Sequence, residues 1–183
     1  MELIERASAL QRLGLIDATE DVKALVARAL ASKDLVDAEK APATALLLAA
    51  GKVLELGAEA EEIGPEDYVE AIAAAAEFLR GVVTIEGVVV KEDEDDPSQF
   101  SVKMTVNGER TGISVQDLGD MLDLAFLIPI ASHLEEKGEK RILCPLVELM
   151  DDTARYILAD PSAVEKAELE EIITAPDFEL EGE

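Results

Sequence analysis

The spacing of apolar residues divides the chain into a helical first part and a mixed second part. In the first part apolar side chains recur every three or four residues, which is the period of an amphipathic helix. Val22, Leu25 and Ala29, for example, share one face. Proline near the start and glycine near the end mark several of these segments. The pattern predicts four helices, in segments 1–14, 17–31, 41–57 and 64–81.

After Gly81 the apolar period changes to two, which is typical of strands with one buried face. Asn107-Gly108 predicts a two-residue hairpin turn, because a type I′ turn needs positive φ at both positions. That turn fixes the register, with Val106 facing Glu109. One face then collects the apolar side chains of Phe100, Val102, Met104, Val106, Ile113 and Val115.

A further strand, 82–91, precedes this hairpin. Pairing Val90 with Gln99 would add Val83, Ile85 and Val89 to the apolar face and set Glu86 opposite Lys103. The two registers agree about which face is buried. We therefore expect a three-stranded antiparallel meander with one face covered by helices.

The C-terminal part predicts more helices. Segment 115–138 is a mostly apolar helix that Pro129 should kink or end, because the proline ring removes a backbone donor. Segment 140–144 is ambiguous and could be a short strand. Segment 145–160 is predicted as a helix with Val147, Met150, Ala154 and Ile157 inside. Pro161 could start another helix, over 161–174.

The expected fold class is α+β: an N-terminal four-helix region, then the meander, then C-terminal helices and a short disordered acidic tail. We expect a helical subdomain over 1–81 and a sheet-and-helix part over 82–174, packed together as one domain. The tail, 175–183, has several acids and no stop signal, so it is predicted to be disordered.

Charge narrows the choice of partners. The 183-residue chain has 16 basic and 41 acidic residues, a net charge of -25. This surplus argues against binding nucleic acid or anionic membranes, because phosphate contacts need clustered Lys and Arg. A basic protein is the expected partner, and a free sheet edge could also pair two copies of the chain. One cysteine, an acidic N-terminus and apolar runs too short to cross a bilayer favour the cytoplasm.

Two acidic groups are the candidate partner-binding residues. The first is a run in the loop between two predicted strands; the second repeats every three residues at the start of the predicted helix 115–138. Solvated surface, contact with a basic partner and a metal site are the alternatives for both, but the run lacks the EF-hand ligand pattern. The residues are Glu92, Asp93, Glu94, Asp95, Asp96, Asp117, Asp120 and Asp123.

No catalytic, cofactor or metal motif is recognised. His133 is the single histidine, near a predicted helix end, where the helix dipole favours a positive charge. Cys144 lies among apolar residues that raise a thiol's pKa. A nucleophile–base pair of these two has no local signature.

The leading hypothesis is a non-enzymatic binding protein that presents an acidic surface to a basic partner. Two classes of acidic protein share this composition: secretion chaperones, and immunity proteins that block nuclease toxins. The role would be that of an inhibitor or adaptor. Three alternatives remain open: a metal-dependent or small-molecule enzyme with scattered carboxylates, a DNA-mimic inhibitor, and a designed sequence without an evolved function. Salt adaptation could also explain the acidity.

Overall fold

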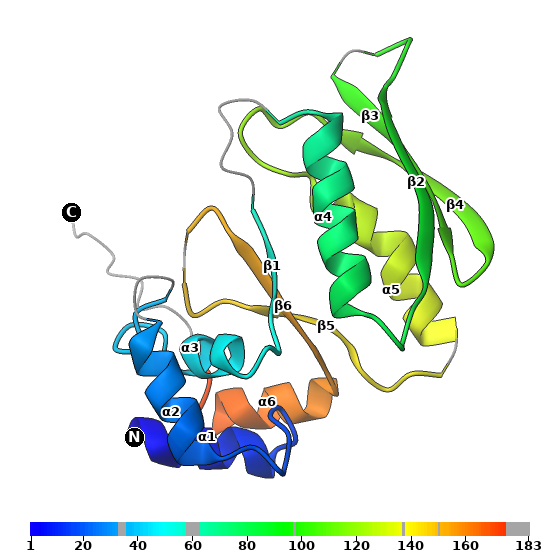
Figure 1. Ribbon diagram of the computed structural model, residues 1–183. Helices are drawn as coiled ribbons and strands as arrows, with labels where there is room; N and C mark the ends of the chain where they lie inside the picture. Colours follow the sequence, from blue (N-terminus) through cyan, green and yellow to red (C-terminus); the bar gives the residue numbers. More distant parts are fainter. Residues whose placement is uncertain (33–35, 58–62, 97, 137, 150, 175–183) are drawn as a thin grey trace. The chain divides into compact units, whose positions relative to one another are not determined.

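The computed structural model describes residues 1–32, 36–57, 63–96, 98–136, 138–149 and 151–174, and over these residues the fold is α+β (Figure 1). Six α-helices, one 3₁₀ helix and two antiparallel three-stranded sheets occur in this part of the chain. The chain forms two compact units. The first comprises Met1–Val53, Cys144–Asp151 and Arg155–Glu183, and the second comprises Leu54–Leu143 and Asp152–Ala154.

The first unit contains four of the helices. N-cap residues begin two of them. The Asp21 side chain accepts hydrogen bonds from backbone amides in the first turn of α2, and the Asp160 side chain accepts one in the first turn of α6. Leu10, Leu25 and Leu46 are fully buried and form part of the core. The helices are α1 (Leu3–Arg12), α2 (Val22–Ala31), α3 (Pro42–Ala49) and α6 (Pro161–Leu169).

The predicted four-helix region is only partly correct. Each of the four segments contains a helix, but the third ends at Ala49, and Leu54–Leu56 forms strand β1. Gly51 has a φ of 66°, and the amide of Gly51 bonds back to Leu48, which closes the helix. The fourth helix, α4 (Pro65–Phe78), belongs to the second unit. The predicted boundary at residue 81 lies inside that unit.

The prediction of a helix over 145–160 is wrong. This region instead supplies part of strand β5 (Ile142–Leu146) and all of β6 (Ala154–Ala159), in a sheet with the order β1-β6-β5. Burial in β6 alternates with a period of two, and Arg155, Ile157 and Ala159 are buried. Val147, predicted to be inside, is 47% exposed. Met150 lies outside the described residues.

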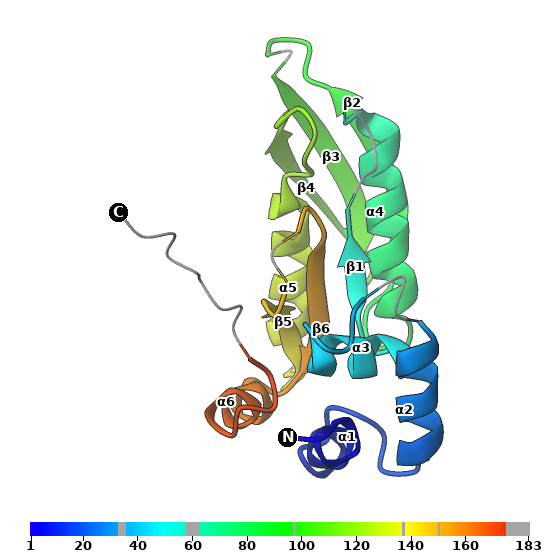
Figure 2. The ribbon, with the colours of Figure 1, turned by 90° about the vertical axis from the view of Figure 1, so that its left-hand side faces the viewer.

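The second unit contains the predicted meander. Strands β2 (Ile85–Glu92), β3 (Gln99–Val106) and β4 (Glu109–Gln116) are antiparallel in the order β2-β3-β4. Helices α4 and α5 (Leu127–Glu136) cover one face of this sheet (Figures 1 and 2). The predicted β3–β4 register, with Val106 opposite Glu109, is confirmed.

The predicted β2–β3 register is wrong. Val90 pairs with Val102 rather than Gln99, and Glu86 pairs with Thr105. The pairing shifts between Glu86 and Val89, where Gly87 has a φ of 62°. This irregularity turns Val89 outward, where it is 45% exposed.

The predicted helix 115–138 is much shorter in the structure. Strand β4 continues to Gln116, a 3₁₀ turn η1 covers Leu124–Phe126, and α5 begins only at Leu127. Pro129 therefore lies in the first helical turn, where its missing N–H costs no intrahelical bond, so the helix runs on without ending there. No helix in the described part of the chain has the length and apolarity needed to cross a membrane. The predicted disorder of 175–183 concerns residues outside the described part.

Candidate functional site

The second unit has an acidic end, where three connections meet. They are the start of α4 with Glu66 and Asp67, the β2–β3 connection, and the segment that joins β4 to η1 (Figure 1). The amide of Asp117 donates to Ser98 O at 2.8 Å, and that of Ile63 donates to Gly119 O at 2.8 Å. The sheet register thus brings the two predicted acidic groups to the same end of the unit.

The β2–β3 connection is shaped by two of its own carboxylates. Asp93 accepts a bond from the amide of Asp95 at 2.9 Å. Asp96 accepts bonds from the hydroxyl of Ser98 at 2.6 Å and from the amide of Gln99's side chain at 2.9 Å. These bonds, led by the one from the Ser98 hydroxyl, lower the pKa of Asp96. The remaining acids, Glu92, Glu94 and Asp95, are exposed.

The segment after β4 is not the helical acidic stripe that the spacing predicted. Asp117 accepts a bond from the amide of Gly119 at 2.9 Å. Asp123 accepts bonds from the amide of Gln116 at 2.8 Å and from that of Ala125 at 2.9 Å. These bonds stabilise a loop, because short acidic side chains capture nearby backbone donors. Of the three, Asp120 is exposed, whereas Asp117 and Asp123 are half-buried.

Tyr68 of α4 anchors this loop, a role that sequence reasoning did not assign. Its ring is fully buried against Phe100 and Phe126, at centroid distances of 5.5 and 6.2 Å. Its hydroxyl donates to Gln116 O at 3.1 Å and accepts from the amide of Asp123 at 3.0 Å. Burial raises the pKa of Tyr68, so the phenol stays protonated and remains a donor.

Tyr68→Phe is expected to destabilise the second unit by about 1–2 kcal/mol, because it leaves the carbonyl of Gln116 and the amide of Asp123, which meet the hydroxyl in part-buried bonds, without their partner. The amide of Asp123 should then exchange with solvent faster. Denaturant unfolding and hydrogen exchange measure the two effects. Tyr156→Phe is the matched control; an equal loss in the control would show that the Tyr68 hydroxyl does not anchor the loop.

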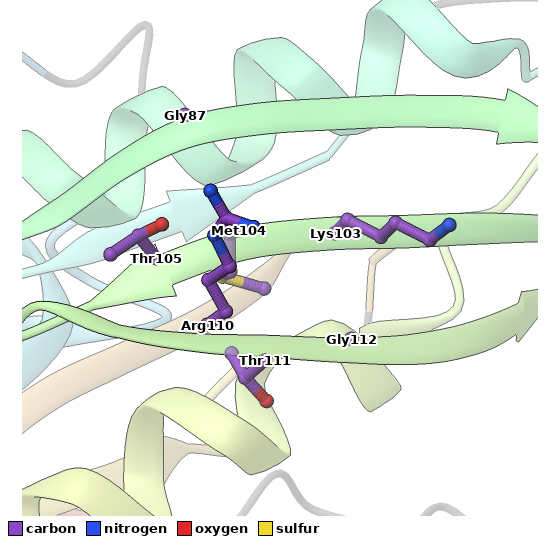
Figure 3. A pocket seen from close by; sticks show the side chains of 7 residues that line it. All are labelled: Gly87, Lys103, Met104, Thr105, Arg110, Thr111 and Gly112. Carbon is purple, nitrogen blue, oxygen red and sulfur yellow. The ribbon is translucent and has the colours of Figure 1, made fainter.

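The uncovered face of the β2-β3-β4 sheet is locally basic. A shallow hollow of about 540 Å³ lies there, and Figure 3 shows Arg110 reaching from β4 across β3, with Lys103 lying along β3. Gly87 and Gly112 flank it, so their missing side chains leave the space open. The predicted hairpin register already implied that Lys103 and Arg110 share this face, but sequence reasoning assigned the two bases no role. Its full lining is Gly87, Lys103, Met104, Thr105, Arg110, Thr111 and Gly112.

A third cluster combines the single histidine with two carboxylates. One ligand atom each from Glu109, His133 and Glu136 lies within 4.8 Å of the others. His133 Nδ1 is 3.5 Å from a Glu136 carboxylate oxygen, and the histidine side chain is 13% exposed. Sequence reasoning named no metal ligand. The hairpin register was the available signal for Glu109: it pairs Glu109 with the buried residue Val106 and so places Glu109 on the covered face of the sheet.

Cys144 is a buried thiol in the first unit. Its Sγ lies 3.8 Å from Ala159 O. Burial raises the pKa of the thiol, and Glu168 and Asp160 raise it further, so the reactive thiolate is disfavoured.

Comparison of the chain with protein-family models, with curated proteins and with solved structures finds no match.

Proposed function

We propose that the protein is a non-enzymatic binding module whose acidic end receives a basic surface of a partner protein. The observation that carries this proposal is the convergence of three acidic connections at one end of the second unit. Segments 63–72, 92–102 and 111–123 contain no Lys or Arg that would neutralise them. Several negative carboxylates close together create a local negative potential that attracts cationic groups.

The loops of the acidic end favour binding for a second reason. Hydrogen bonds of Asp93, Asp96, Asp117 and Asp123 hold the backbone, while Glu92, Glu94, Asp95 and Asp120 remain exposed for contact. A partner therefore meets a surface that is already shaped, which reduces the entropy lost on binding. Complementary charge of this kind speeds association and makes it dependent on salt.

A charge-neutral triple variant tests the proposal. Glu92→Gln, Glu94→Gln and Asp95→Asn remove three exposed charges whose carboxylates accept no hydrogen bond from the described residues of the loop. The probe is a synthetic peptide of alternating Lys and Arg, titrated calorimetrically at low and at moderate salt. The triple variant is expected to bind about tenfold more weakly than the wild-type chain, which corresponds to about 1.4 kcal/mol.

The matched control carries the same change in net charge on exposed residues of the first unit: Glu39→Gln, Glu165→Gln and Glu168→Gln. It should bind the peptide within about twofold of wild type, because none of its three charges belongs to the connections of the acidic end. Equal weakening in both triples would mean that net charge alone attracts the peptide, and the acidic end would have no special role.

A further inference from the structure

We propose that Glu109, His133 and Glu136 form a binding site for a divalent transition-metal ion of the zinc class. The site lies in the second unit, and its residues are separate from those of the acidic end. Two ligands stand one turn apart on α5, and the third comes from the start of β4. Neither a lone histidine nor a lone pair of carboxylates makes such a site; here the imidazole and the two carboxylates meet from two different elements.

The fold brings the three side chains together through the hairpin register. Glu109 follows the Asn107-Gly108 turn and pairs with Val106, which is fully buried beneath the helices. Side chains of paired residues leave a sheet on the same face, so Glu109 emerges on the face that α5 covers. His133 and Glu136 are three residues apart on α5, which places them on the same side of that helix.

The spacing suits a metal. Tetrahedral zinc bonds of about 2.0–2.2 Å put neighbouring ligand atoms about 3.3–3.6 Å apart. His133 Nδ1 and the Glu136 oxygen are 3.5 Å apart already. One carboxylate oxygen of Glu109 lies within 4.8 Å of one ligand atom from each of the other two residues, and Glu109 is exposed, so its side chain can close the remaining distance by rotation.

The ligand types decide the class of ion. A largely buried imidazole provides a fixed nitrogen ligand, which selects zinc and its neighbours over Mg²⁺ and Ca²⁺. Two carboxylates balance the charge of a divalent ion. Three protein ligands leave a fourth position for water, the arrangement of open zinc sites. The bound ion would join α5 to the start of β4 and so stabilise the folded second unit.

The test is calorimetric titration of the full chain with Zn²⁺, together with the visible absorption of bound Co²⁺ and thermal melts. One ion per chain should bind, and Zn²⁺ should raise the melting midpoint at concentrations where Mg²⁺ does not. His133→Gln and Glu109→Gln should each weaken Zn²⁺ binding by at least about tenfold. Glu135→Gln removes an equal charge from the same helix outside the cluster and should change the affinity by less than about twofold.

Two results would overturn the proposal. One is a Zn²⁺ affinity that His133→Gln and Glu109→Gln leave unchanged; the other is an equal loss in Glu135→Gln, which would indicate diffuse attraction by the negative surface. Circular dichroism of the metal-free variants checks their folding. Because Glu109 is exposed, its variant stays informative even where His133→Gln fails to fold.

Discussion

Replacing Glu148 by alanine is expected to lower the free energy of unfolding of the first unit by about 3 kcal/mol. The side chain is 4% exposed and accepts bonds from two threonines. One carboxylate oxygen receives the amide of Thr44 at 2.7 Å and its hydroxyl at 2.9 Å. The other receives the amide of Thr174 at 3.1 Å and its hydroxyl at 3.2 Å.

The magnitude follows from what the substitution leaves behind. Ala41, the N-cap residue of α3, provides no side-chain acceptor, so Glu148 satisfies a free amide of the first turn from a distant part of the chain. Alanine would leave the buried donors of Thr44 and the part-buried donors of Thr174 without partners, at a cost of about 1–3 kcal/mol for each unsatisfied buried group before relaxation. Glu148→Gln keeps an oxygen acceptor and should cost less, about 1–2 kcal/mol.

Urea denaturation of the two Glu148 variants measures these losses. Glu165→Ala, which removes an exposed carboxylate from α6, is the control and should stay within about 0.5 kcal/mol of wild type. If Glu148→Ala behaved like this control, the carboxylate would contribute no net stability, and solvent would be satisfying the threonine donors.

Strong local signals made much of the second unit predictable. Asn107-Gly108 determines the turn, and the turn determines every pair between β3 and β4, including Gln99 opposite Gln116. That last pair implies that the residues beyond it, on both strands, lie next to each other. The meeting of the two acidic groups at one end of the sheet was therefore contained in the predicted register, although the second group was assigned to a helix.

The errors arise where a local pattern has two physical explanations. Acids at every third position, Asp117 to Asp123, imitate a helical stripe, but these side chains bond to nearby backbone amides and stabilise a loop. In β2, the observed pairing differs from the predicted one by two residues at Glu86 and by three at Val90, because an irregularity near Gly87 adds one residue to the offset; alternation alone reveals neither the offset nor the irregularity.

Contacts between distant segments were beyond local reasoning altogether. The role of Glu148 was not predicted, because its partners are 104 and 26 residues away in sequence. The apolar segment around β6 was equally compatible with a buried helix or a strand, and tertiary pairing decided between them. The cluster of Glu109, His133 and Glu136 needed both the hairpin register and the packing of α5, of which only the first was predicted residue by residue.

Phe126→Ala is expected to cost the second unit about 3–5 kcal/mol, the range observed for removing a large aromatic side chain from a core. Phe126 is fully buried and meets Tyr68 edge to face, at an interplanar angle of 89°. Phe126 lies in η1, between the segment that follows β4 and helix α5, so the cavity left by the substitution would loosen both. Phe126→Leu, which keeps most of the apolar volume, should lose less.

The measurement is denaturant unfolding combined with hydrogen exchange of amides in the second unit. Met121→Ala is the matched control, because Met121 lies in the segment before η1 and is 51% exposed. This variant should change the free energy of unfolding by less than about 0.5 kcal/mol. Faster exchange at Asp123 in Phe126→Ala would link core packing to the shape of the acidic end. Unchanged exchange there, despite lower stability, would mean that the Tyr68 hydroxyl holds the loop without help from the aromatic core.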